Sequence, residues 1–414
     1  MKKTSTVILA LFLFSCLSWG IEDAKTTAKL IKPNNLTYKG AFRLPDGPPG
    51  SEVKTWAWGG SAATYYPSGD PKGKKDGYPG SIFGTGHAWE HQVSEISIPK
   101  PVRSKNLNDL PVAKTLQGFQ DILDVSNLEI PRTGLCYLPK QGNQKTDKIH
   151  FCWGYHMQDD PSHQDLTHGW CETNLTNPNI QRGWYLAGLP THLRHMSTND
   201  YMFEIPKRWA NKKTGGNLLA TGRYRDGGWS GQGPSIYAIA PWNDGNPPAS
   251  GSAIANTVLL QYDDTYTGEA ANHTMKNYHH SDEWSGSVWL KAGTKMAVIF
   301  VGTKGTGDCW YGNENGPCLN CENRGWWSTG FDGLIIFYDP KQLAKVASGK
   351  WPAYRPQPYA TLNIDKYLYN VNSTQQKHHL GAACFDSKKR NLYVFEPFVD
   401  NDKPVVHVWK VKKK

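Results

Sequence analysis

Two kinds of short strand-like segment recur along the chain, and this recurrence constrains the fold more than any other feature of the sequence. Segments of the first kind lead into glycine: SIFGTG (81–86), KIHFCWG (148–154), NLLATG (217–222) and MAVIFVG (296–302). Segments of the second kind stop at proline or aspartate, or close the chain: VSEISIP (93–99), YMFEIP (201–206), SIYAIAP (235–241), GLIIFYDP (333–340) and VVHVWKV (405–411). Helical periodicity is confined to a short stretch around 340–346. An inner strand, a loop and an outer strand ending in a turn are typical of a β-propeller blade.

The number of blades follows from the length of the chain. About 394 residues remain after an N-terminal signal of 20 residues. A blade of roughly 40–60 residues then gives six to eight blades, and we expect seven. The structural alternative, a two-sheet sandwich, would need fewer strands. No linker divides the sequence, so we predict an all-β protein whose residues 21–414 form a single seven-bladed propeller domain.

The N-terminus, MKKTSTVILALFLFSCLSWG, indicates export. Two lysines precede an apolar run that is too short for a membrane-spanning helix, which is the pattern of a signal peptide. Two cleavage patterns fit: ordinary cleavage after Gly20, or a lipoprotein signal cleaved before a lipidated Cys16. We therefore predict a secreted protein or an outer-membrane-anchored lipoprotein. No second apolar segment is long enough to span a bilayer.

The charge balance suggests the kind of partner. The formal net charge is +10, of which the signal segment carries two positive charges. An exported basic protein suits an anionic polysaccharide better than nucleic acid, although a basic surface without a specific partner is the plain alternative. The 17 tryptophans and 20 tyrosines fit sugar stacking and also fit the filling of a β core. We expect a monomer that needs no organic cofactor.

Cysteine spacing predicts a metal site. Cys309, Cys318 and Cys321 lie in GDCWYGNENGPCLNC (307–321), and the pair His279-His280 lies upstream. Three thiolates and one imidazole, which we assign to His280 with His279 as the alternative, would form a closed tetrahedral site for one structural zinc ion per chain. The alternative is a disulfide between Cys309 and one member of the CxxC pair.

The other cysteines of the exported chain suggest disulfides whose pairing the sequence leaves open. Cys136 and Cys152 fall in segments that could form one hairpin, and a Cys152–Cys171 bond is equally compatible with the spacing. Cys384 has no assigned partner.

Histidines and arginines supply candidate substrate contacts. His150, His156, His163 and His168 are concentrated between residues 149 and 170, and we favour functional roles for His156 and His168. Arg223 and Arg225 lie in GRYRDGG (222–228), which we place at the end of an inner strand near the channel mouth. There either arginine could grip a carboxylate or sulfate bidentately. A salt bridge to Asp226 is the structural alternative.

Over most of its mature length the sequence resembles propeller polysaccharide lyases that act on ulvan, together with related exported bacterial propellers. The resemblance is carried by framework motifs, which indicate the fold more specifically than the activity. They are WAWGGSAATYYP, GTGHAWEHQVSEISIP, YMFEIPKRW, GRYRDGGWSGQGPSIYAIAPW, FVGTKGTGDCWYG and RNLYVFEPFVDNDKPVVHVWK. The resemblance implies a seven-bladed propeller with a structural zinc, and β-elimination at a 4-linked uronate.

Carried over by position, the resemblance also implies residue roles. His156 or His168 matches the histidine pair that supplies the base, and Tyr201 matches the catalytic tyrosine. Arg223 would neutralise the uronate carboxylate, and Tyr262 would contact the substrate. The histidine spacing departs from the family pattern, so His150 stays a further candidate for the base.

Two other functions compete with the lyase. A propeller glycoside hydrolase would need two carboxylates across the scissile bond, for which Asp226, Asp282 and Glu283 are available without an evident pair. A non-catalytic propeller that binds sulfated glycans would explain the positive charge equally well.

Overall fold

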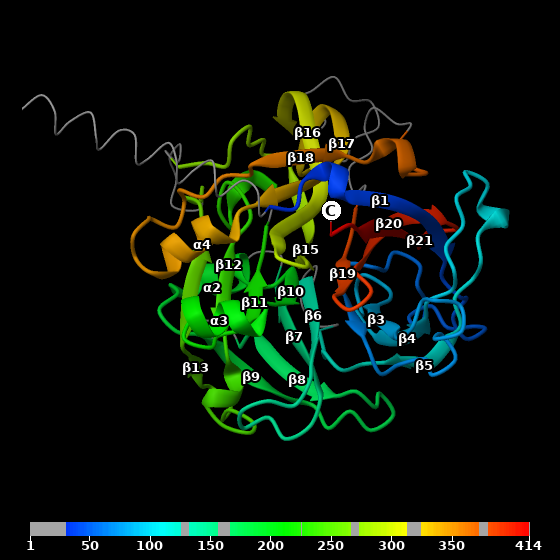
Figure 1. Ribbon diagram of the computed structural model, residues 1–414, viewed down its shortest axis with the longest axis horizontal. Helices are drawn as coiled ribbons and strands as arrows, with labels where there is room; N and C mark the ends of the chain where they lie inside the picture. The colour runs from blue at the N-terminus through cyan, green and yellow to red at the C-terminus, as the bar shows by residue number, and fades with distance from the viewer. Residues whose placement is uncertain are drawn as a thin grey trace, which may run out of the picture.

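The computed structural model describes residues 30–125, 132–155, 166–224, 226–265, 273–312, 324–371 and 380–413. Its strands form five sheets, four of four antiparallel strands and one of five in which the last strand pairs in parallel. The first strand of each sheet packs against the first strands of two others, so that β2, β6, β10, β15 and β19 close a ring. Figure 1 shows β6, β10, β15 and β19 gathered near the middle of the molecule with the remaining strands outside them. The protein is a five-bladed β-propeller.

We number the blades by their innermost strands. Blade 1 comprises β2 (Ala63–Tyr66), β3 (Ser81–Thr85), β4 (Val93–Ser97) and β5 (Thr115–Gln120). Blade 2 comprises β6 (Arg132–Leu138), β7 (Lys148–Gly154), β8 (His168–Glu172) and β9 (Gln181–Leu186), with β13 (Ala253–Ile254) added in parallel. Blade 3 comprises β10 (Tyr201–Glu204), β11 (Leu219–Gly222), β12 (Ile236–Ile239) and β14 (Asn256–Leu260).

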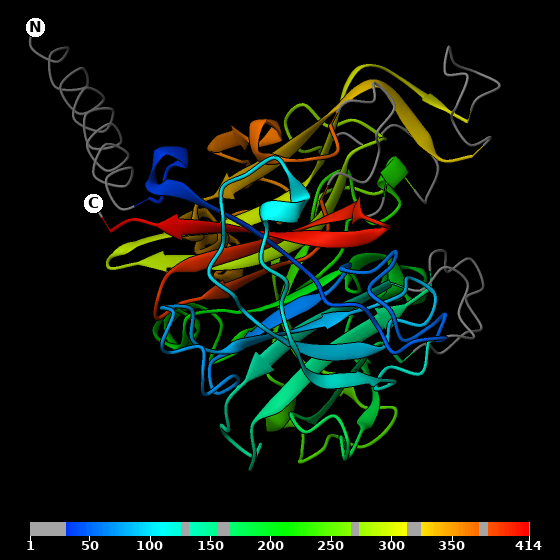
Figure 2. The same ribbon diagram turned by 90° about the vertical axis from the view of Figure 1, so that its right-hand side faces the viewer.

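The last two blades include the longest strands and the closure of the ring. Blade 4 comprises β15 (Glu283–Ala292), β16 (Lys295–Tyr311), β17 (Trp326–Tyr338) and β18 (Ala360–Asn363). Blade 5 comprises β19 (Ala383–Asp386), β20 (Asn391–Asp400), β21 (Lys403–Val411) and β1 (Leu36–Arg43). Because β1 pairs with β21 from Leu36↔Val411 to Arg43↔Val405, the two ends of the chain fasten the propeller. Figure 2 shows β16 and β17 projecting from the body as a long arm.

Helices are few and short in the described part of the chain. The α-helices are α2 (Thr191–Ser197), α3 (Lys207–Lys213) and α4 (Pro340–Ala347), and 3-10 turns occupy Pro33–Asn35 (η1), Leu107–Asp109 (η2), Asp226–Gly228 (η3), Pro241–Asn243 (η4) and Asp365–Tyr367 (η5). The helix predicted around 340–346 is confirmed as α4, whose N-cap Asp339 accepts a hydrogen bond from Lys341 N. No helix among the described residues is long and apolar enough to cross a membrane.

The prediction of an all-β propeller is confirmed, but the prediction of seven blades is wrong. Small residues let five inner strands approach closely: a Cβ added at Gly286 would lie 2.7 Å from Ala383 N, and one at Gly134 would lie 2.9 Å from the Tyr201 carbonyl carbon. The blades are also longer than we assumed, because long segments join one blade to the next. Division by an average blade length therefore overestimated the number of blades.

The assignment of inner strands is also corrected. The segments that lead into glycine are β3, β7, β11 and the first part of β16, which are the second strands of their blades. Four inner strands, β2, β6, β15 and β19, belong to neither recurring type, and only YMFEIP is innermost, as β10. Arg223, which follows β11, is therefore one strand removed from the central channel.

Candidate functional site

The central channel has two mouths of different character. Residues at the start of the five inner strands line a throat of about 10 Å³, which has room for about one water molecule. Residues at the opposite ends of the same strands line a cavity of about 460 Å³. The inner strands therefore run in the same direction, and we call the two ends the N-terminal mouth and the C-terminal mouth.

Charged residues gather at the N-terminal mouth. Arg132 is the first residue of β6, Asp200 directly precedes β10, and Glu283 is the first residue of β15. These three strands are consecutive members of the ring. Three neighbouring blades thus bring one arginine and two carboxylates to the same rim.

Asp200 is held in a largely desolvated position. Its side chain is 5% exposed, with Oδ1 3.6 Å from Arg223 Nε and Oδ2 accepting a hydrogen bond of 3.2 Å from Tyr224 N. Burial raises the pKa of Asp200, Arg223 and Arg132 oppose that shift, and the negative charge of Glu283 adds to it. A buried carboxyl group beside a second carboxylate is suited to hold and deliver a proton.

Hydroxyl groups and an imidazole extend the rim on the side of blades 1 and 2. His91 is buried, and its Nδ1 lies 3.2 Å from Ser61 Oγ and 3.1 Å from Thr133 Oγ1. Ser61 lines the throat just before β2, and Thr133 belongs to β6. His91 therefore bridges two blades at the N-terminal mouth.

Two tryptophans stand exposed on loops of blade 1 at this end of the molecule. Trp58 is 47% exposed and precedes Ser61 by three residues, and Trp89 is 56% exposed in the turn between β3 and β4. The Trp58 ring packs edge-on against His87 at 5.4 Å. Exposed indole faces next to a polar rim are suited to stacking on sugar rings.

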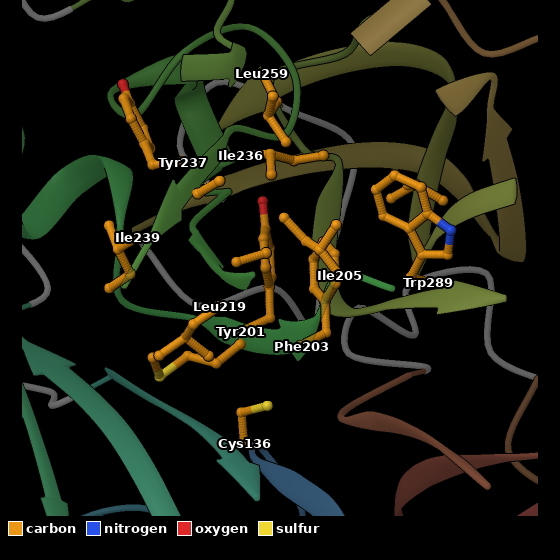
Figure 3. Packing of buried hydrophobic residues seen from close by; sticks show 14 of the residues in the cluster. Cys136, Tyr201, Phe203, Ile205, Leu219, Ile236, Tyr237, Ile239, Leu259 and Trp289 are labelled. Atoms are coloured by element: carbon orange, nitrogen blue, oxygen red, sulfur yellow. The ribbon is translucent and has the colours of Figure 1, made fainter. Parts of the chain in front are cut away.

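Tyr201, which we predicted to be catalytic, is a core residue. It is 3% exposed, and its hydroxyl donates to Ser235 O at 2.9 Å and accepts from Ser235 N at 3.2 Å. Figure 3 shows its ring within the buried hydrophobic cluster, with the hydroxyl end directed toward Ile236. Burial raises the pKa of the phenol well above its usual range, with Asp200 adding to the shift.

Arg223 is completely buried and serves backbone acceptors. Its Nη1 donates to Tyr155 O at 2.9 Å and also to His195 O, and its Nε faces Asp200. The guanidinium thus joins the loop after β7 to helix α2 and to the start of β10. This geometry lets Arg223 position Asp200, and it directs the guanidinium to protein groups and away from solvent.

Two of the predicted histidines are also inside the blades. His168 lies between Thr167 Oγ1 at 2.7 Å and Thr221 Oγ1 at 3.0 Å, and His150 Nε2 lies 2.9 Å from Gln144 Oε1. Burial lowers the pKa of each imidazole to about 3, so both are neutral at physiological pH. His156 and Arg225 lie outside the described residues.

The predicted substrate contact Tyr262 is likewise enclosed. It is 1% exposed, and its hydroxyl donates to Pro356 O at 2.6 Å and lies 3.0 Å from Tyr338 Oη. The roles assigned from the resemblance to Tyr201, Arg223, His150, His168 and Tyr262 stay predictions. The physical argument against these roles is that protein partners occupy the polar groups: the Tyr201 hydroxyl donates to Ser235 O, the Tyr262 hydroxyl to Pro356 O, and the Arg223 guanidinium to Tyr155 O.

Asp282 and Asp226, the other two carboxylates considered for hydrolysis, are not placed at the rim in the way that Glu283 is. Asp282 is fully buried and accepts from Lys304 Nζ at 2.8 Å, Gly305 N at 3.0 Å and His279 N at 3.1 Å. Its role is to tie β16 to the segment before β15. The side chain of Asp226 is outside the described part of the structure.

Two of the four predicted zinc ligands can be placed. Cys309 is half-buried on β16, and the His280 ring stacks on Trp326 of β17 at 4.3 Å. Trp326 pairs with Tyr311, two residues after Cys309, so the histidine lies against the arm that carries the cysteine. Cys318 and Cys321 lie outside the described residues. Thiolates and an imidazole are a donor set that suits zinc.

The disulfides considered among the remaining cysteines are absent from the described structure. Cys136 and Cys152 are not opposite each other on β6 and β7, because Cys136 pairs with His150 and Cys152 pairs with Gly134. Burial raises the pKa of all four thiols, which keeps them protonated and unreactive. The buried free cysteines are Cys136, Cys152, Cys171 and Cys384.

Comparison with known proteins gives only remote structural likenesses. No family model matches the chain, and no curated protein matches it. One similar structure is described as belonging to the GH130 family of mannoside phosphorylases, which contains glycoside hydrolases that target β-1,2 mannosidic linkages in Candida mannan. It shares 9% identity over 91% of this chain and 95% of its own, with a TM-score of 0.39.

Two further structures come from Bacteroides. A glycosyl hydrolase from Bacteroides ovatus shares 9% identity over 90% of this chain and 94% of its own, with a TM-score of 0.38. A putative phosphatase from Bacteroides thetaiotaomicron shares 10% identity over 92% of this chain and 79% of its own, with a TM-score of 0.36. Likenesses this remote leave the activity to be argued from the site itself.

Sequence reasoning missed Asp200 and Arg132 entirely, and it did not pair Glu283 with another carboxylate. These residues share a place at or just before the start of an innermost strand. The sequence gives no signal of that place, because β6 and β15 belong to neither recurring type of segment and their inner position is set by the fold. The pair Asp200 and Glu283 becomes visible only when blades 3 and 4 are placed side by side.

Proposed function

We propose that this protein is an exported carbohydrate-active enzyme that cleaves a glycosidic bond at its N-terminal mouth. The observation that carries the proposal is the placement of Asp200 and Glu283 at the starts of adjacent inner strands, with Arg132 and Arg223 beside Asp200. Glycoside cleavage needs two carboxyl groups of different character across the scissile bond. The proposal therefore favours the propeller glycosidase over the lyase.

The two carboxyl groups receive distinct roles. Asp200, whose pKa burial raises, protonates the departing glycosidic oxygen. Glu283, on the next blade, supplies the negative charge that faces the developing oxocarbenium ion or activates the attacking water. Arg223 and Arg132 act as positioning residues, because their charges keep Asp200 in place and limit the rise of its pKa.

An anionic polysaccharide is the substrate class that we propose. The sequence is basic, and Trp58 and Trp89 present exposed indole rings on the loops of blade 1. Stacking on these rings would hold a sugar next to the rim without a need for a deep pocket. Ulvan, with its uronates and sulfates, is the first polymer to test.

The lyase reading is the second candidate, and product chemistry separates the two. A lyase leaves a C4–C5 double bond that absorbs near ~232 nm, because β-elimination removes the C5 proton. A hydrolase releases reducing ends without that absorbance. Purified enzyme is incubated with ulvan, glucuronan, alginate and a neutral mannan, and both signals are followed. Reducing ends without absorbance support the proposal, and absorbance at this wavelength would overturn it.

Variants test the residue roles. Asp200→Asn should lower kcat by about 10²–10⁴ because it removes the proton donor, and Glu283→Gln should be comparably impaired. The matched control is Asp339→Asn, which changes another buried carboxylate but preserves the N-cap of α4. Full activity in both mouth variants, with the folded state verified by circular dichroism, would refute the assignment.

We also propose the structural zinc predicted from the sequence, bound by Cys309, Cys318, Cys321 and His280. The position of His280 against the β16–β17 arm supports it, since the arm and the segment before β15 would then be fastened to each other. Such an ion would stabilise the arm and would take no part in the carboxylate chemistry.

A further inference from the structure

A groove opens on the outer edge of blade 5, away from the central channel. Its volume is about 580 Å³, and it lies between β1, the segment before η2 and the 3-10 turn η5. Figure 2 shows the segment that carries η2 crossing in front of β1 and β21. Bridges from Ala41 to Val102 and from Arg43 to Val112 fix that crossing. The groove is therefore a built feature of the blade.

The lining combines positive charge with aromatic surface. Arg103, Lys105 and Lys366 supply three cations, Tyr38 and Tyr367 supply two rings, and none of the described residues that line the groove is acidic. The two tyrosine rings stack with centroids 4.2 Å apart, which gives the groove one rigid wall. We call this feature the blade-5 groove.

The three cations are held by neutral groups. Arg103 donates to Tyr38 O, Lys105 Nζ donates to Leu368 O and lies 5.5 Å from the Tyr369 ring, and Lys366 Nζ lies 5.0 Å from the Tyr367 ring. None of the ion pairs recorded within the described ranges includes these cations. Their positions are set by uncharged partners and not by ion pairs, which leaves the three cations able to bind an anionic ligand.

Nearby carboxylates are engaged elsewhere. Asp109 of η2 accepts hydrogen bonds from Ser104 Oγ at 2.6 Å and Asn106 Nδ2 at 3.4 Å. Asp365, next to Lys366 in sequence, accepts from Gly333 N at 2.7 Å and Asn363 Nδ2 at 3.0 Å. Acidic groups are thus present in the neighbourhood, but they serve turns and backbone.

Positive charge continues from the groove across the same blade, from β1 through β21 to the turn between β19 and β20. Lys410 lies opposite Thr37, which lines the groove, and its ammonium group lies within electrostatic range of Lys39, Lys389 and Arg390. Burial lowers the pKa of Lys410 and these like charges add to the effect, whereas Asp386 opposes it. Such an electropositive strip attracts an extended polyanion more than a compact ion.

We propose that the blade-5 groove is a second glycan site, which binds a carboxylate- or sulfate-bearing sugar of an anionic polysaccharide outside the channel. The cations take the oxyanion, the tyrosine wall packs against the ring, and the basic strip follows the next units of the polymer. The inference does not depend on the proposed cleavage at the N-terminal mouth, because it uses different residues and predicts binding alone.

The test compares two variants with the same change in net charge. Arg103→Gln/Lys105→Gln/Lys366→Gln neutralises the groove, and Lys72→Gln/Lys74→Gln/Lys75→Gln neutralises three exposed lysines of the loop between β2 and β3. Affinity electrophoresis is run in ulvan, alginate, κ-carrageenan and neutral dextran. Alginate carries only carboxylates and carrageenan only sulfates, so the two gels identify the oxyanion.

We expect the groove variant to bind its polyanion about tenfold more weakly and the loop variant to stay within about twofold of wild type. Added salt should weaken wild-type binding, and dextran should not bind. Equal losses of affinity in the two variants would show that binding depends only on the net charge of the protein, and this would overturn the proposal. Absence of wild-type binding to every polyanion would also overturn the proposal. In a parallel sedimentation assay, binding only to phosphatidylglycerol vesicles would do the same.

A second pair of variants tests the aromatic wall, and a third measurement separates this site from the mouth. Tyr367→Phe keeps the stack on Tyr38 and should bind like wild type, whereas Tyr367→Ala should lose affinity, with both melting temperatures recorded. Asp200→Asn should retain groove binding even where cleavage is lost. If Asp200→Asn abolished binding as well, the groove would not be an independent site.

Discussion

Replacement of Tyr201 by phenylalanine distinguishes a catalytic phenol from a structural one. The ring and its edge-to-face packing against Phe300 at 5.4 Å stay in place, and only the hydroxyl is removed. That hydroxyl donates to Ser235 O and accepts from Ser235 N in a fully buried setting. The substitution therefore tests the two hydrogen bonds without creating a large cavity.

The expected loss of stability follows from the hydrogen bonds that Ser235 retains after the substitution. Its N–H has a second acceptor, Arg223 O at 3.3 Å, so the amide retains a partner after the substitution. Its carbonyl oxygen loses the phenol donor. Loss of a buried hydrogen bond with one partner left behind costs about 1–3 kcal/mol, and the retained acceptor places this variant toward the lower end, at about 1–2 kcal/mol.

Two measurements decide the role of Tyr201. Urea unfolding should show a lower midpoint with an unchanged m-value, and kcat on the polymer that the enzyme cleaves should stay within about threefold of wild type, well short of the losses that follow removal of an acid–base group. Tyr359→Phe, which removes a hydroxyl that donates to Ile31 O in the segment before η1, is the stability control. Unchanged stability together with a collapse of kcat would refute the structural reading and restore the predicted catalytic tyrosine.

Three other predictions concern buried groups and the metal. Burial raises the pKa of Asp282 to about 6, so the folded state favours its protonated form: this stabilisation is complete below the unfolded pKa, and about 3 kcal/mol is lost as the pH rises through 6. Urea unfolding of wild type at pH 4.5 and 7 should show about 2 kcal/mol of this loss, because the remainder has already occurred at pH 4.5, and Asp282→Asn should not show it. Parallel pH profiles of the two proteins would contradict the prediction. Metal analysis should find about one zinc per chain, and Cys318→Ser should lose the metal and melt at a lower temperature; a metal-free, fully stable wild type would end the zinc proposal. A thiol reagent should leave the four buried cysteines unlabelled in the native protein and label them after denaturation; they are Cys136, Cys152, Cys171 and Cys384. Rapid labelling of the native protein would contradict their burial.

Local patterns in the sequence were sufficient for the class of fold. Short apolar runs bounded by glycine, proline and aspartate identify strands, because strand formation and turn chemistry depend on neighbouring residues. Helix α4 was equally accessible from its periodicity and its Asp-Pro start. The signal peptide and the zinc ligands also rest on local spacing, and they stay predictions.

Only the tertiary structure decided the number of blades, the identity of the inner strands and the place of the site. These depend on contacts between distant segments, such as Gly286 against Ala383 and β1 against β21, which no local pattern encodes. The same holds for individual side chains: Tyr201 and Arg223 have the right chemistry for a lyase, but neighbouring strands bury them. Asp200 and Glu283 look ordinary in the sequence, and they become a pair because closure of the ring places the starts of β10 and β15 side by side. Burial and proximity are properties of the packed chain, and they set the protonation and the reach of a functional group.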